Sequence, residues 1–127
     1  MPDYDANQFN PPAPLARVTV RTRDRANSVS DVPMLIDSGS DTTLIPRSCA
    51  DRLGLRGETQ EGVLLVGFDG SESRAEVVDV EVRFLRRTFR GEFPIIDDEV
   101  GILGRNVLNR LSIVLDGPRL DWHEEKD

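Results

Sequence analysis

Asp37 is the residue of this chain whose type and setting best suit acid–base chemistry. It opens the polar segment Asp-Ser-Gly-Ser-Asp (37–41), which lies between the apolar runs 34–36 and 44–45. A carboxylate in such apolar sequence is poorly solvated, which is costly without a compensating role. Carboxylates act as general acids and bases in hydrolysis. The simpler alternative is a turn or helix cap, which is the commoner role of an isolated Asp-Ser-Gly.

Two later segments favour the catalytic interpretation. A hairpin tip with an Asp-Gly pair follows at 67–71, and Ile102–Asn106 reads Ile-Leu-Gly-Arg-Asn. Together with 37–40, these segments resemble the retropepsin-like aspartic proteases, the single-domain relatives of pepsin. Residues 37–40 match that family's Asp-Thr/Ser-Gly-Ala/Ser signature, and 102–106 match its hydrophobic-hydrophobic-Gly-Arg-Asn/Asp motif. The resemblance extends over roughly residues 15–122.

The resemblance implies an aspartic endopeptidase that hydrolyses peptide bonds with an activated water and no cofactor. Such chemistry needs two carboxylates that share one proton, one acting as base and the other as acid. This chain carries the motif once, at Asp37; the Asp-Gly pairs at 69–70 and 116–117 lack the flanking pattern. A complete site then requires a homodimer whose two-fold axis passes between two copies of Asp37.

The family's other loop residues map onto neighbours of Asp37. Ser38 matches the hydroxyl that ties the two loops together across the axis, and Gly39 matches the glycine that approaches the dyad. Ser40 supplies a hydroxyl that we expect to donate to Asp37. Asp41 matches a substrate-binding aspartate that forms a structural ion pair with Arg105, for which a planar guanidinium is well suited.

The hairpin at 67–71 falls where the family has its flap, which closes over extended substrate. An ordinary surface hairpin is the simpler alternative. Two apolar residues before the late glycine align with the family's pocket-lining positions, although either could equally belong to the core. The candidate substrate-binding residues beyond Asp41 are Gly67, Phe68, Asp69, Gly70, Val100 and Ile102.

The elements that position these residues are mainly short strands, so we predict an all-β fold with one or two short helices. Alternating or continuous apolar runs predict strands, among them 15–20, 32–36, 62–66, 78–84 and 88–96. Pro46 and Gly54 bracket one short helix, and a second follows at 105–111. We expect a pepsin-like acid protease barrel with one lobe per chain. The domain would span 15–122, between a Pro-rich flexible arm (1–14) and a charged tail (123–127).

The composition narrows the possible partners. With 127 residues, 16 basic and 23 acidic, the chain has a net charge of −7, which disfavours nucleic acid and anionic membranes. It shows neither a membrane-spanning run nor a secretory signal pattern, and it has one cysteine, so we expect a cytoplasmic protein. The expected partners are a peptide or protein substrate and a second copy of the chain.

Other candidate sites are weaker. A thiol enzyme built on Cys49 and His123 is less favoured than a packed cysteine and a histidine in the tail. One Cys and one His do not make a usual zinc site, and the acidic run 97–99 fits a solvated loop better than a metal site. The arginines at 83, 86, 87 and 90 fit exposed hairpin faces, and Trp122 fits a packing position or a dimer edge. The main rival function is a non-catalytic peptide-binding or dimerisation module with the same fold.

Overall fold

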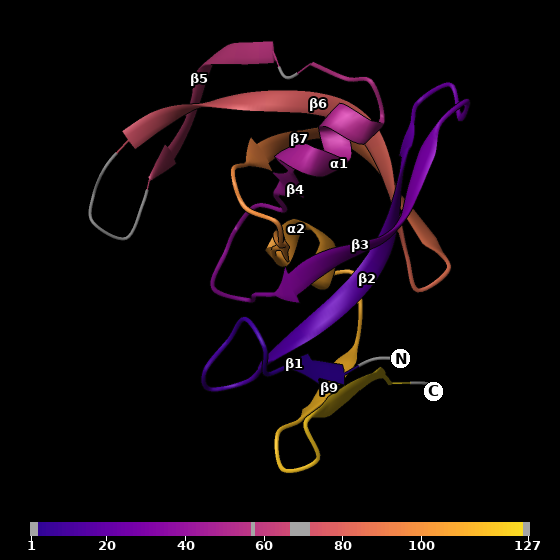
Figure 1. Ribbon diagram of the computed structural model, residues 1–127, viewed down its shortest axis with the longest axis vertical. Helices are drawn as coiled ribbons and strands as arrows, with labels where there is room; N and C mark the ends of the chain where they lie inside the picture. Colours follow the sequence, from indigo (N-terminus) through magenta and orange to yellow (C-terminus); the bar gives the residue numbers. More distant parts are fainter. Residues whose placement is uncertain (1–2, 57, 67–71, 126–127) are drawn as a thin grey trace.

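The computed structural model describes residues 3–56, 58–66 and 72–125, and for 58–66 and 72–75 it describes the backbone only. Within these residues, ten strands and two short helices form the fold (Figure 1). The strands are β1 (Asp3–Asp5), β2 (Ala13–Thr22), β3 (Ser28–Ile36), β4 (Ile45–Pro46), β5 (Glu58–Val66), β6 (Glu72–Phe84), β7 (Arg87–Ile96), β8 (Gly101–Leu103), β9 (Ile113–Asp116) and β10 (Asp121–Glu124). The helices are α1 (Arg47–Arg52) and α2 (Arg105–Leu108). The predicted all-β class is therefore confirmed.

The strands join in one sheet whose main path runs β4-β7-β6-β2-β1-β10-β9. Both ends of this path remain open, so the sheet curves but does not close into a barrel. Three strands lie off the path: β3 pairs with β2, β8 pairs in parallel with β3, and β5 pairs with β6. The parallel β3–β8 pair brings residues far apart in sequence to one edge, where the candidate site lies.

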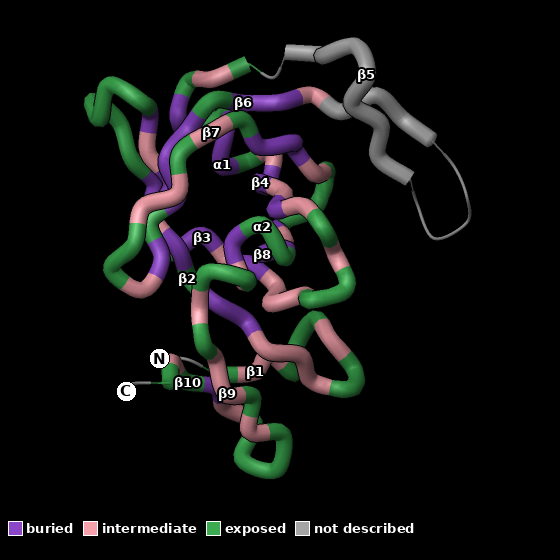
Figure 2. The backbone as a smooth tube through the Cα atoms, turned by 180° about the vertical axis from the view of Figure 1, so that it is seen from behind, coloured by how far each residue is buried: buried purple, intermediate pink, exposed green. Residues whose placement is uncertain are grey.

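Alternation of apolar and polar residues along the long strands explains which side chains form the core. In β6, Val78, Val80, Val82 and Phe84 are buried, while Asp79 and Arg83 between them are exposed. β-Branched and aromatic side chains at every second position pack well on one face of a pleated sheet. Figure 2 shows buried positions gathered along β2, β3, β6 and β7, whereas the β9–β10 hairpin is mostly intermediate or exposed.

Helix α1 forms where the sequence predicts it. Pro46 precedes its first residue, and Gly54 follows its end with φ +73°, a conformation that glycine adopts without strain. The N–H of Gly54 bonds to the Asp51 carbonyl and that of Leu55 to the Ala50 carbonyl, which is a Schellman ending. Helix α2 is shorter than predicted, ending at Leu108. Neither helix, nor any other in the described part of the chain, is long and apolar enough to cross a membrane.

Part of the Pro-rich N-terminal segment is a strand. Residues Asp3–Asp5 form β1, which pairs with β2 on one side and with β10 on the other. On β10, Trp122 is buried and packs against Phe84. Its indole N–H donates a hydrogen bond to the Leu15 carbonyl at 2.9 Å. The packing role predicted for Trp122 is confirmed. The two ends of the domain are thus tied together within one chain.

Candidate active site

Asp37 lies immediately after β3, where two backbone hydrogen bonds fix the chain. Its N–H donates to the Leu103 carbonyl at 3.1 Å, which extends the parallel pairing of β3 with β8. Its own carbonyl accepts the Ser40 N–H at 3.1 Å, closing a tight turn. The backbone of Asp37 is therefore held by the sheet, while its side chain is only half-buried.

Among the described residues, the carboxylate of Asp37 accepts one hydrogen bond, from the Gly39 N–H to Oδ1 at 2.9 Å. A Cβ on Gly39 would lie 3.1 Å from that same oxygen, closer than most Cβ contacts. Glycine therefore lets the backbone approach the carboxylate closely, as the family resemblance implies. Within the described residues, no second carboxyl group hydrogen-bonds to Asp37.

The late segment packs directly beneath the Asp37 loop. A Cβ on Gly104 would lie 2.3 Å from the Thr42 carbonyl oxygen, so only glycine fits there. The Arg105 N–H donates to the Ser40 carbonyl at 2.8 Å, and the Arg105 guanidinium donates to the Ser38 carbonyl at 2.8 Å. The two sequence motifs are thus brought into contact.

Thr43 supports the Asp37 loop, a role that its position in the sequence did not predict. Its side chain is fully buried, and its Oγ1 accepts the Gly104 N–H at 3.0 Å while donating to Asn106 Oδ1 at 2.7 Å. One hydroxyl therefore links the loop to the start of α2. The only available signal was a threonine directly before the apolar run at 44–45, which by itself does not indicate a partner.

Strand β8 is held on both sides. It pairs with β3, and Ile102 exchanges backbone hydrogen bonds of 2.8 and 3.0 Å with Leu44, which follows the loop. A Cβ on Gly101 would lie 2.4 Å from the Met34 sulfur and 2.6 Å from the Leu44 carbonyl oxygen. Close packing of three backbone segments therefore sets the position of the Asp37 loop.

Two predicted contacts are not formed. The Ser40 hydroxyl donates to the Thr42 carbonyl at 2.7 Å rather than to Asp37, because the turn directs it along its own loop. The Asp41–Arg105 ion pair is also absent: Arg105 is bonded to Ser38, and Asp41 accepts the Thr42 hydroxyl at 3.2 Å. Ser40 and Arg105 nevertheless support the loop, through the backbone.

The flap residues predicted at Gly67, Phe68, Asp69 and Gly70 lie outside the described residues. The hairpin arms are described: β5 and β6 pair antiparallel as far as Val66 and Glu72. In Figure 1 this hairpin lies above the loop that connects β3 to β4. Of the proposed pocket residues, Val100 is buried at 6% exposure and Ile102 is partly exposed.

The alternative thiol site is disfavoured by the environment of Cys49. The thiol is buried on α1, and burial raises its pKa to about 11. A thiol with such a pKa holds little nucleophilic thiolate near neutral pH. His123 is exposed on β10. No group of three or more potential metal ligands occurs among the residues whose placement is described.

Comparisons with known proteins agree with this architecture. The family described as Aspartyl protease matches residues 18–107, and the chain belongs to that family. Among solved structures, EIAV protease in complex with the inhibitor HBY-793 is similar, with a TM-score of 0.57 and 24% sequence identity. The match covers 77% of this chain and 86% of that one. At this identity the likeness shows the fold, which is retropepsin-like. No curated protein matches the chain.

Proposed function

We propose that the chain is an aspartic endopeptidase whose active site is formed by Asp37 from each of two protomers. The main support for the proposal is the burial and hydrogen bonding of the Asp37 carboxylate. It is half-buried, accepts a single N–H from the described residues and lies on a loop that the Gly104–Asn106 segment holds in place. Its remaining lone pairs are available to a water molecule and to a second carboxyl group.

The proposed reaction uses two carboxyl groups with one proton between them. Like charges at short range oppose double ionisation, so the two carboxyl groups share one proton, as in aspartic proteases generally. The ionised Asp37 takes a proton from water, which attacks the peptide carbonyl, while the protonated Asp37 donates to the carbonyl oxygen. Collapse of the tetrahedral intermediate breaks the C–N bond and passes a proton to the leaving amine.

Ser38 supports the assignment of a dimer. Its side chain is exposed, and its hydroxyl makes no hydrogen bond within the described part of the chain. Its carbonyl, in contrast, is fixed by Arg105. A fixed backbone with a free hydroxyl beside Asp37 suits a contact with the second loop across a two-fold axis. In this proposal the substrate lies extended between the Asp37 loops and the β5–β6 hairpin, which serves as the flap.

A substitution at Asp37 tests the activity. Wild type, Asp37→Asn and the control Asp31→Asn are incubated at high concentration with a diverse peptide library from acidic to neutral pH. Asp31 is an exposed residue at φ +57°, a conformation that asparagine also adopts. We expect cleavage by wild type and the control, and a loss of about 10³-fold in Asp37→Asn because its acid–base group is removed.

Mass spectrometry identifies the cleaved bonds, and circular dichroism checks that each variant folds. Folded wild type that cleaves no peptide at any pH contradicts the proposal and favours the non-catalytic peptide-binding or dimerisation module. Equal cleavage by wild type and Asp37→Asn contradicts the assignment of Asp37.

A further inference from the structure

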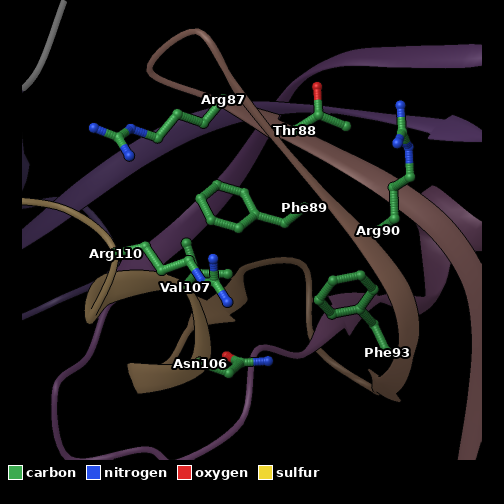
Figure 3. Close-up of a pocket in the computed structure, with 8 residues that line it drawn as sticks. All are labelled: Arg87, Thr88, Phe89, Arg90, Phe93, Asn106, Val107 and Arg110. Atoms are coloured by element: carbon green, nitrogen blue, oxygen red, sulfur yellow. The ribbon is translucent and has the colours of Figure 1, made fainter.

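A groove of about 580 Å³ lies between β7 and α2, lined by residues outside the Asp37 loop. Figure 3 shows Arg87, Phe89 and Phe93 on β7 and Val107 and Arg110 at α2 around this space. We call it the arginine groove. It does not share a residue with the Asp37 loop, although Asn106, which bonds to Thr43, is in its wall.

Two of the groove's charges are uncompensated. Arg87 and Arg110 are exposed and take part in none of the ion pairs among the described residues, whereas Arg90 is paired with Glu81 at 2.6 Å. Two guanidinium groups without a described ion-pair partner at one site are unusual in a chain with net charge −7, in which carboxylates outnumber basic groups. Guanidinium groups bind carboxylates through paired, charge-assisted hydrogen bonds. The groove is therefore electrostatically suited to an acidic partner.

The outer edge of β7 is open beside these arginines. On that side, and within the described residues, β7 pairs with β4 alone, at Ile95 and Ile96. Leu85 and Arg86 form a two-residue turn with positive φ, so the closing pair Phe84–Arg87 exchanges both of its hydrogen bonds. Backbone groups along a strand point alternately toward and away from a given neighbour, so the N–H and C=O groups of Thr88 and Arg90 point away from β6. No backbone group in the described ranges bonds to them.

The groove also has an apolar floor. Phe93 and Val107 are buried, and Phe89 is partly buried. In Figure 3 the rings of Phe89 and Phe93 lie on the side of β7 that faces α2, whereas Thr88 and Arg90 point to the other side. An added strand would thus meet open backbone groups, apolar rings and free guanidinium groups together.

We propose that the arginine groove binds an extended, acidic protein segment that adds to β7 as a further strand. On the face toward α2 this segment carries an apolar side chain between carboxylates, which reach Arg87 and Arg110. A second copy of β7 is disfavoured at this edge because it would bring the positively charged arginines of two chains close together. Nucleic acid is disfavoured because the chain is acidic overall. The proposal concerns binding and does not depend on catalysis at Asp37.

A labelled peptide tests the proposal on the full chain with Asp37→Asn, a variant chosen because its cleavage of peptides is expected to be strongly reduced. The probe is fluorescein-labelled Thr-Glu-Thr-Leu-Thr-Glu-Thr, whose two Glu and central Leu share one face of a strand. We expect saturable binding by fluorescence anisotropy. Arg87→Ala or Arg110→Ala should each weaken it by about tenfold or more, the usual effect of losing a charge-assisted hydrogen bond. Arg119→Ala, which removes an exposed arginine from the turn between β9 and β10, should leave the affinity unchanged.

Backbone methylation separates strand addition from simple charge attraction. Residues of one alternate set in an added strand point their N–H groups at β7, and the other set points them at solvent. N-methylation of one set should abolish binding, while N-methylation of the other should preserve it. Any of four results would overturn the proposal: no saturable binding, equal weakening by Arg119→Ala, equal binding of a peptide with Lys in place of Glu, or equal affinity for both methylated peptides.

Discussion

Glu81 on β6 is 2% exposed and contacts guanidinium groups from three segments, whereas Asp37 at the end of β3 is half-buried and receives one N–H from its own loop. Arg21 and Arg90 lie directly opposite Glu81 on the two neighbouring strands, and Arg25 approaches at 3.3 Å. The hydrogen bond from Arg90, followed by that from Arg21 and the charge of Arg25, lowers the pKa of Glu81 to about 2.

The difference shows how one fold uses carboxylates for two purposes. The lone pairs of Glu81 are occupied by cations, so its charge is fixed and stabilises the pairing of β6 with β2 and β7. Asp37 is constrained through its backbone and through the residues beneath it, which leaves its carboxylate available for a proton, a water molecule or a partner. The comparison predicts that substitution of Glu81 lowers the stability of the fold, whereas substitution of Asp37 lowers activity and leaves the fold intact.

Glu81→Gln should cause the largest loss of stability among the variants below, because three guanidinium groups lose their buried partner. The depressed pKa of Glu81 means that its stabilisation is complete above its ordinary pKa of 4.5 and is lost as the pH falls toward about 2. Thermal melts from pH 7 to pH 2 should therefore show a marked fall in the wild type. The fall should be smaller in Glu81→Gln, which already has a lower melting temperature at pH 7. Parallel pH dependence in the two proteins would contradict this role.

Gly104→Ala should cost about 3 kcal/mol of unfolding free energy, because its Cβ would overlap backbone atoms of Thr42 that cannot easily move. Urea unfolding measures this loss. Gly117→Ala is the matched control: no atom lies within 4 Å of its added Cβ, and its φ is not in the left-handed region. Equal effects of the two substitutions would show that close packing at Gly104 is not what holds the loop.

Thr43→Val should cost about 1–3 kcal/mol, because the buried Gly104 N–H and Asn106 amide oxygen each lose their partner. Thr43→Ser keeps the hydroxyl and should retain most of the stability. The same urea series separates the two variants. A Thr43→Val protein as stable as wild type would mean that the hydroxyl bridge does not support the Asp37 loop.

Ser40→Ala should have the smallest effect, about 1 kcal/mol, because it removes one hydrogen bond to the Thr42 carbonyl. Since this hydroxyl does not contact Asp37, the pH–rate profile for peptide cleavage should keep its shape. Should the acidic limb of that profile move, the Ser40 hydroxyl would instead interact with the ionised Asp37 in the active form.

The sequence predicted the local features of this fold well. Pro46 and Gly54 are sufficient to place α1, and alternation is sufficient to place β6 and β7. It did not predict β1, because three residues carry no periodicity and their pairing with β10 is set by the distant end of the chain. For the same reason, Glu81 reads as an ordinary polar position until the register brings Arg21 and Arg90 alongside it.

The sequence predicted which residues form the candidate site better than it predicted the contacts between them. The two motifs around Asp37 and Gly104 were identified by their resemblance to a family, and the structure brings them together. The partner predicted for Arg105 was wrong. Its long side chain can reach either Asp41 or the Ser38 carbonyl, and the geometry of the loop determines which of them it bonds to. Thr43 received no role because a hydrogen-bond network spanning 61–63 residues leaves no local pattern.

Mixing wild type with Asp37→Asn tests most directly whether two copies of Asp37 make the active site. At fixed wild-type concentration, increasing amounts of the folded variant are added and peptide cleavage is measured. If activity needs two carboxylates, heterodimers lack one of them, so activity should fall as the variant is added. For wild type alone, activity should rise faster than linearly with concentration at dilution. Activity that is indifferent to the variant and linear in wild-type concentration would contradict the shared site.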